Sequence, residues 1–153
     1  MDTKGFTLIE MLLTAILLAA LAAIALPGFA ASRTRMVTRH AVDEFRSAHS
    51  LARSIAIRNG RVTELHIDAA NGRFWLQLDT TFAGTGVMDT IGVVKDISIE
   101  KLTMTSTRSY VCFDARGLAT RANNCPAGDA TVVFSRGSYA DTVNTTALGK
   151  VLR

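Results

Sequence analysis

Several side chains in this sequence belong to types that carry out catalysis, but their spacing does not bring a nucleophile and a base together. Ser135, His66 and Asp114 would be the members of a Ser-His-Asp arrangement. The sequence around Ser135 has no nucleophile-elbow pattern, and no glycine-rich loop has phosphate-binding spacing. We therefore expect no enzymatic activity and no cofactor.

The histidines give no metal-binding pattern. His66 lies between Leu65 and Ile67 in an alternating segment, so its side chain should point to the face opposite theirs. It has no second His, Cys or carboxylate at ligand spacing. His40 and His49 lie in a helical segment, where we expect both on the surface. No metal site is predicted.

A lone carboxylate, Glu10, precedes the most apolar part of the chain. Residues 11–32 contain no charged side chain, and about twenty such residues cross the hydrocarbon core of a bilayer as a helix. A carboxylate beside such a helix is costly and tends to be kept for a function. Glu10 either neutralises a positive group on a neighbouring copy of the helix or lies at headgroup depth, favoured by the helix dipole.

The segment Lys4-Gly5-Phe6-Thr7-Leu8-Ile9-Glu10, ahead of a long apolar helix, closely resembles the signal of type IV pilins and of the pseudopilins of type II secretion. In that family a prepilin peptidase cuts after the glycine, and the new amino terminus is N-methylated. The resemblance implies cleavage between Gly5 and Phe6 and methylation of Phe6. It also implies assembly roles for Glu10 and for the mid-helix Pro27.

Ordinary signal-peptidase cleavage is the alternative, because Ala22-Ala23-Ile24-Ala25 offers small residues late in the apolar segment. However, the charged leader ends at Gly5, and the apolar segment is longer than a typical signal core. The order of residues from Phe6 to Glu10 would also have no explanation. The pilin-like interpretation is therefore favoured.

The apolar pattern of a helix continues beyond the membrane-spanning segment. Between residues 33 and 59, apolar side chains recur at spacings of three and four: Val37, Ala41, Phe45, Ala48, Ala52 and Ile55. Pro27-Gly28 would kink the helix without necessarily ending it, whereas Asn59-Gly60 supplies a stop. We predict one long helix, with its second half packed under a globular head.

After Gly60 the period changes from helix to strand. Residues 61–68 and 74–78 alternate apolar with polar around a turn at Ala69–Gly72, which predicts a hairpin. Further strands are expected at Val93-Val94, Ile97–Ile99, Tyr110–Phe113, Thr131–Phe134 and within Asp141–Leu152, with a loop over Asp79–Gly92. The predicted fold class is α+β, a long amino-terminal helix packed on an antiparallel sheet of about five to seven strands.

The expected organisation is a leader at 1–5, a transmembrane or filament-core helix at 6–32 and a head at 33–153. In the head, 33–59 is an amphipathic helix and 60–153 is β-rich; about 120 residues suffice for one domain. The pilin resemblance places the head in the periplasm before assembly, anchored in the inner membrane. After assembly it would lie in a periplasmic pseudopilus or an extracellular pilus.

The charge balance permits an anionic partner. From Arg33 onward sixteen Lys and Arg stand against eleven Asp and Glu, so nucleic acid or an anionic surface can be attracted. Positive charges beside a membrane span usually stay cytoplasmic, yet the pilin-like interpretation places these outside. The expected topology therefore depends on the motif and not on charge counting.

Cys112 and Cys125 are the two cysteines of the chain. Export would favour their oxidation, and a bridge across this short loop would contribute about 3 kcal/mol by chain-entropy reasoning. No CxxC pattern supports a redox or metal role. We predict a Cys112–Cys125 disulfide, with two free buried thiols as the alternative.

A second resemblance concerns the head. A strand at 110–113, the Asp-x-Arg-Gly turn Asp114–Gly117, a strand at 131–134, a glycine turn and a short basic tail resemble the GspH/FimT branch of the family. That branch implies a minor subunit, either the H-type pseudopilin or a FimT-type minor pilin. The implied partners are other pilin or pseudopilin subunits, the prepilin peptidase and the inner membrane.

Some FimT-type minor pilins bind DNA during natural transformation, through a tail of the form Gly-Arg-x-Arg. The tail here, Gly149-Lys150-Val151-Leu152-Arg153, has lysine in place of the first arginine and one extra residue before the second. Lys150 and Arg153 could neutralise phosphates, although on a strand they would point to opposite faces. DNA binding is thus the alternative function. The other interpretation of Lys150 and Arg153 is that they are solvated surface charges without a ligand.

Overall fold

The computed structural model describes residues 5–81, 87–119 and 129–152. The chain divides into two compact units, Met1–Met36 and Val37–Arg153, and each is considered by itself. One helix, α1 (Leu8–Asn59), contributes to both units and continues through Pro27, as predicted. Within the described residues it contains one stretch that is long and apolar enough to cross a membrane.

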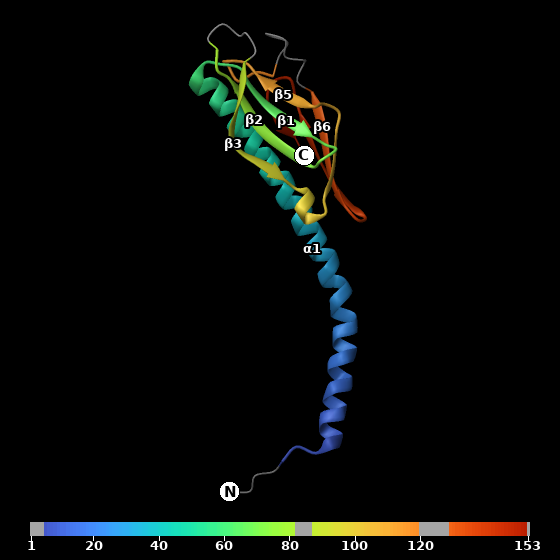
Figure 1. Ribbon diagram of the computed structural model, residues 1–153. Coiled ribbons are helices and arrows are strands. Elements are labelled where there is room, and N and C mark those ends of the chain that lie inside the picture. Colours follow the sequence, from blue (N-terminus) through green and yellow to red (C-terminus); the bar gives the residue numbers. More distant parts are fainter. Residues whose placement is uncertain (1–4, 82–86, 120–128, 153) are drawn as a thin grey trace. The chain divides into compact units, whose positions relative to one another are not determined.

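The second unit contains two antiparallel sheets of four strands each. The order in the first sheet is β3 (Met88–Asp96), β2 (Arg73–Asp79), β1 (Thr63–Asp68) and β5 (Tyr110–Phe113). The order in the second is β4 (Thr103–Ser106), β6 (Ala130–Arg136), β7 (Tyr139–Thr145) and β8 (Val151–Leu152). Figure 1 shows the second half of α1 alongside the strands of this unit.

The core of the head forms where the helix meets both sheets. The buried residues of α1 follow a spacing of three and four: Thr38, Ala41, Val42, Phe45, His49, Ala52 and Ala56. The Phe45 ring lies 5.5 Å from that of Phe74 on β2 and 5.7 Å from that of Phe134 on β6. These tilted and edge-on contacts join the helix to one strand of each sheet, and aromatic pairs of this kind add to the effect of burial.

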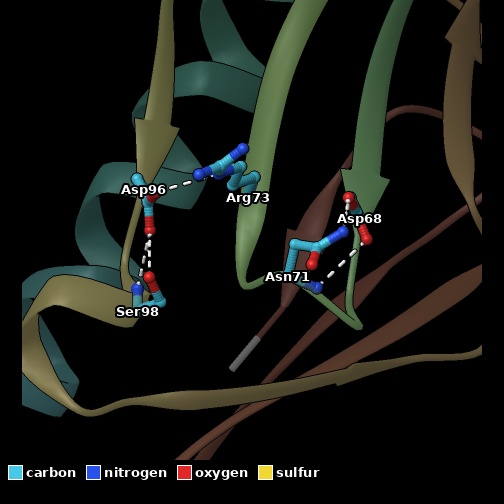
Figure 2. Close-up of polar contacts among 5 residues, drawn as sticks. All are labelled: Asp68, Asn71, Arg73, Asp96 and Ser98. Carbon is cyan, nitrogen blue, oxygen red and sulfur yellow. Dashed lines mark hydrogen bonds and ion pairs between the residues drawn. The ribbon is translucent and has the colours of Figure 1, made fainter.

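Polar side chains fix the turns of the first sheet (Figure 2). Asp68 at the end of β1 accepts hydrogen bonds from the backbone N–H and the side-chain amide of Asn71, at 3.1 and 2.7 Å. Arg73 Nε lies 2.9 Å from Asp96 Oδ2 and links β2 to β3. Asp96 also accepts hydrogen bonds from the N–H and hydroxyl of Ser98. These bonds, chiefly from Ser98 and then from Arg73, lower the pKa of Asp96.

The predicted α+β architecture, a long helix against an antiparallel β head, is confirmed, but some elements differ. One sheet of five to seven strands was expected, whereas the described residues form eight strands in two sheets. Ile97–Ile99, expected as a strand, overlaps the 3-10 helix η1 (Ser98–Glu100). The Asp96 side chain holds the start of this turn, and Lys101 ends it in a left-handed conformation, with φ 55°.

Two further segments were not predicted as strands. Met88–Gly92, expected to be loop, belongs to β3, while residues 82–86 of that expected loop lie outside the described residues. The threonines and serine of Thr103–Ser106 gave no strand signal, yet the segment pairs with β6 and buries Met104. Hydrogen bonding to β6 therefore stabilises a strand that the local apolar pattern does not indicate.

Candidate functional site

The amino-terminal segment presents the predicted processing and assembly residues without tertiary contacts among the described residues of its unit. Gly5 and Phe6 lie outside regular structure and are exposed. Thr7 caps α1, because its carbonyl and its Oγ1 both accept the Glu10 N–H, at 3.1 and 3.3 Å. Thr7-x-x-Glu10 is thus the sequence pattern of a capping box. In the described chain the Glu10 carboxylate has no ion pair.

The following part of the helix exposes apolar side chains on all sides. Its exposed large hydrophobic residues are Leu8, Ile9, Met11, Leu12, Leu13, Ile16, Leu17, Leu18, Leu21, Ile24, Leu26 and Phe29. A helix that is apolar all round needs lipid or other protein to cover it. Pro27 lies inside this helix and lacks the N–H that would bond to the carbonyl of Ala23. Its assembly role stays a prediction.

In the head, Asp114 organises the Asp-x-Arg-Gly turn. Its Oδ1 accepts the backbone N–H groups of Arg116 and Leu118 at 2.9 and 2.8 Å. Its Oδ2 accepts Nε and Nη2 of Arg116 at 3.1 and 3.0 Å. Burial alone would raise the pKa of Asp114, but the bonds from Leu118 and Arg116 outweigh it and lower the pKa. The turn motif therefore has a structural role.

This turn and the carboxyl-terminal tail meet on the helix through two glycines with positive φ, Gly117 at 73° and Gly149 at 70°. A Cβ on Gly149 would lie 2.9 Å from the carbonyl oxygen of Gly117, and a Cβ on Gly117 would lie 2.7 Å from Cδ1 of Ile57. Arg53 Nη1 donates to the carbonyl of Gly149 at 3.2 Å. The tail is thus joined to α1 through the Arg53 side chain, and its close approach to the Gly117 carbonyl requires glycine at position 149.

The sequence-based expectation for His49 was wrong. His49 is buried, at 1% exposure, and its ring meets that of Phe113 edge-on, with centroids 4.9 Å apart. It lies between Phe45 and Ala52 in the buried stripe of α1. Because histidine is polar, the sequence pattern did not indicate this position as buried. Burial, and secondarily the charge of Arg53, lowers the pKa of His49 to about 4. Its Nε2 has no hydrogen-bond partner among the described residues. His40 is exposed, as expected.

Beside His49 lies a depression of about 600 Å³ that we call the basic depression. Its lining comes from α1 and the tail: His49, Ser50, Arg53, Ser54, Ile57, Arg58, Gly149, Lys150 and Val151. Lys150 is exposed at its edge, and Arg153 lies outside the described residues. Sequence reasoning considered only the tail, because nothing in the linear order indicated that Arg53 and Arg58 lie beside it.

The remaining candidates have other local roles. Cys112 is buried on β5, but Cys125 lies outside the described residues, so their disulfide stays a prediction. His66 Nε2 lies 2.8 Å from Glu64 Oε2, and the His66 ring stacks against both Trp75 and Tyr110.

The side chains considered for a catalytic triad each contact a different side chain. His66 contacts Glu64, Ser135 contacts Thr103, and Asp114 contacts Arg116. Over the described ranges, no group of three His, Cys, Asp or Glu side chains could hold a metal ion.

A capped helix that is apolar all round at its start and packs by its second half against a β head defines a type IV pilin-like protein. The comparisons agree: a prokaryotic N-terminal methylation motif matches residues 1–26. The family of the type II transport protein GspH matches residues 41–149. The chain therefore belongs to the GspH family and is a GspH-like minor pilin or pseudopilin.

Solved structures share the fold. The type IV minor pilin FimU of Pseudomonas aeruginosa aligns with a TM-score of 0.59 and 15% identity, over 77% of this chain and 88% of its own. The minor pseudopilin EpsH of the type 2 secretion system of Vibrio cholerae aligns with a TM-score of 0.58 and 12% identity, over 76% of this chain and 94% of its own. No curated protein gives a significant match.

The glycine contact in the tail gives a first prediction. Gly149→Ala should lower the free energy of unfolding by about 1 to 3 kcal/mol more than Gly137→Ala, because overpacking against backbone adds to the cost of positive φ. Gly137 is the matched control, since its φ is 59° and a Cβ there meets nothing within 4 Å. Denaturant unfolding of the full chain in neutral detergent measures both. Equal losses would show that the tail adapts to the extra methyl group.

The buried histidine gives a second prediction. The pKa of His49 is about 4 in the folded chain and near 6.5 when unfolded, so between these values the unfolded state binds more protons. Stability should therefore fall as the pH drops from 7 to 4.5, by about 2 to 3 kcal/mol from this group. His49→Gln should remove that part of the pH dependence, whereas His40→Gln, on an exposed position of the same helix, should leave it. An unchanged profile for His49→Gln would contradict the assignment.

Proposed function

We propose that this chain is a minor subunit of a type IV pilus or a type II secretion pseudopilus. A prepilin peptidase would cut it between Gly5 and Phe6, Phe6 would be N-methylated, and α1 would enter the filament core. The observation that carries the proposal is the exposed apolar surface of α1, most of which lies within the residues that match the methylation motif. Before assembly this surface would lie in the inner membrane, with the head in the periplasm.

Assembly would use the Glu10 carboxylate. Thr7 already supplies the cap for the first turn, so the carboxylate remains available to the methylated amino group of Phe6 on a neighbouring subunit. An unpaired charge among packed apolar helices is costly, and so is an unpaired ammonium group. Their pairing would relieve both and set the axial register between subunits.

The processing step has a direct test. Mass spectrometry of the chain recovered from membranes of its host should find Phe6, methylated, as the first residue. A first residue near position 26 would instead indicate ordinary signal-peptidase cleavage and would overturn this proposal.

The charge of Glu10 can be tested separately from its place in the capping-box pattern. Glu10→Gln keeps a side chain suited to a capping box but removes the charge, so we expect loss from sedimented filaments while membrane insertion persists, as for Glu10→Ala. Thr7→Ala removes the cap at a cost of about 1 kcal/mol and should still assemble.

Normal filament yield with Glu10→Gln would show that the charge is not required. Normal yield with Glu10→Ala would show that Glu10 has no role in assembly.

DNA binding in the manner of a FimT-type minor pilin is the alternative function. It is favoured by the position of Lys150 beside Arg53 and Arg58. If it operates, the full chain should bind duplex DNA with an affinity that falls steeply as salt rises. Replacing Lys150 and Arg153 together by alanine should weaken binding; unchanged affinity would exclude the tail as the contact.

A further inference from the structure

We propose that the basic depression binds a phosphate group through Arg53, Arg58 and Lys150, with His49 as a further hydrogen-bond donor. The proposal is independent of the assembly role. It deepens the DNA alternative, since it names the chemical group that would be contacted and adds two residues of α1 to the tail.

Within the residues that are described, the basic depression carries positive charge without acidic partners. The depression is lined by three cationic side chains and by no carboxylate. In the described part of the chain Arg53, Arg58 and Lys150 form no ion pair, whereas other cations do: Arg46, Arg73, Lys95 and Arg116 each have an acidic partner. Uncompensated positive charges around a concave surface focus the potential there and attract an anion.

One of the cationic groups, the Arg53 guanidinium, is held in place by the tail. The hydrogen bond from Arg53 Nη1 to the carbonyl of Gly149 holds the guanidinium at the edge of the depression. A guanidinium has several donors in a fixed plane, so this bond leaves others for a ligand. The hydroxyls of Ser50 and Ser54 belong to the same lining and add donors of a second kind.

His49 brings a buried ring nitrogen to the depression. The residue lines the depression, it is 1% exposed, and its Nε2 has no hydrogen-bond partner in the residues that the structure describes. A buried polar atom without a partner is costly, and native structures usually supply one. In the neutral tautomer protonated at Nε2, the imidazole would donate to an oxygen of a bound anion once the atoms that cover Nε2 move aside.

These donors suit phosphate better than carboxylate. A carboxylate has two oxygens in one plane, which a single guanidinium can already satisfy. Phosphate presents its oxygens tetrahedrally and accepts from donors that converge from α1 and from the tail. Free phosphate and the phosphodiester of DNA share this chemistry.

The three histidines of the chain provide the readout. The full chain, carrying ring-¹³C histidine in a neutral, phosphate-free detergent, is titrated with inorganic phosphate at pH 7.5 against chloride at constant ionic strength. The His49 signal, assigned by its loss in His49→Gln, should shift and saturate, while those of His40 and His66 remain in place.

Variants test the cations. Arg58→Gln combined with Lys150→Gln should weaken the affinity by about tenfold or more. Both side chains are exposed, so this variant should fold even if Arg53→Gln does not. Arg39→Gln, which removes one charge from an exposed position of the same helix, is the control and should bind phosphate as the unmodified chain does.

A short DNA duplex then identifies the source of the phosphate. Competition between duplex and phosphate for the His49 signal supports a phosphodiester ligand, and phosphate binding without competition supports a free phosphate ligand. The absence of a saturable His49 shift, or an equal shift in the double variant, overturns the proposal. DNA binding that leaves the His49 signal unchanged also overturns it, while the DNA alternative itself survives.

Discussion

The contact of one helical stripe with two sheets is the interaction on which the head depends. Phe45 touches Phe74 in one sheet and Phe134 in the other, so a single side chain connects all three layers of the core. The small residues Ala41, Ala52 and Ala56 along the same stripe are fully buried. They let the strands approach the helix closely, and the tail and the Asp-x-Arg-Gly turn can then rest on its last turns.

Before residue 32 the same helix has a different kind of surface. There the surface is apolar in every direction, and its neighbours must come from outside the chain. The carboxylate of Glu10 and the cap from Thr7 are the main polar features at its start. Along one continuous helix, the first part exposes its apolar side chains and the second part buries a stripe of side chains in the core of the head.

Much of this could be read from the sequence, because the signals are local. The charge-free segment after Glu10, the spacing of three and four in the helix and the alternation around Ala69–Gly72 each depend on a few neighbouring residues. The errors arose where the apolar pattern alone did not decide the outcome. His49 lies in the core because of its position in the stripe, and the Asp96 side chain turns the next residues into a 3-10 helix.

The candidate site shows the same limit. The tail lysine could be identified from its order in the sequence, whereas Arg53 and Arg58 were visible only as members of an amphipathic helix. They become part of one surface with Lys150 because Gly149 accepts a hydrogen bond from Arg53 and approaches Gly117. No pattern within either segment encodes that approach, which depends on the complete head.

The way the tail is attached has a consequence for how such proteins diversify. Backbone pairing of β8 with β7, the close approach of Gly149 to Gly117 and the side chain of Arg53 hold it in place. The exposed positions beyond, such as Lys150 and Leu152, contribute little to that attachment. Related proteins could therefore differ in these exposed side chains, and gain or lose affinity for a ligand there, without a change in the fold of the head.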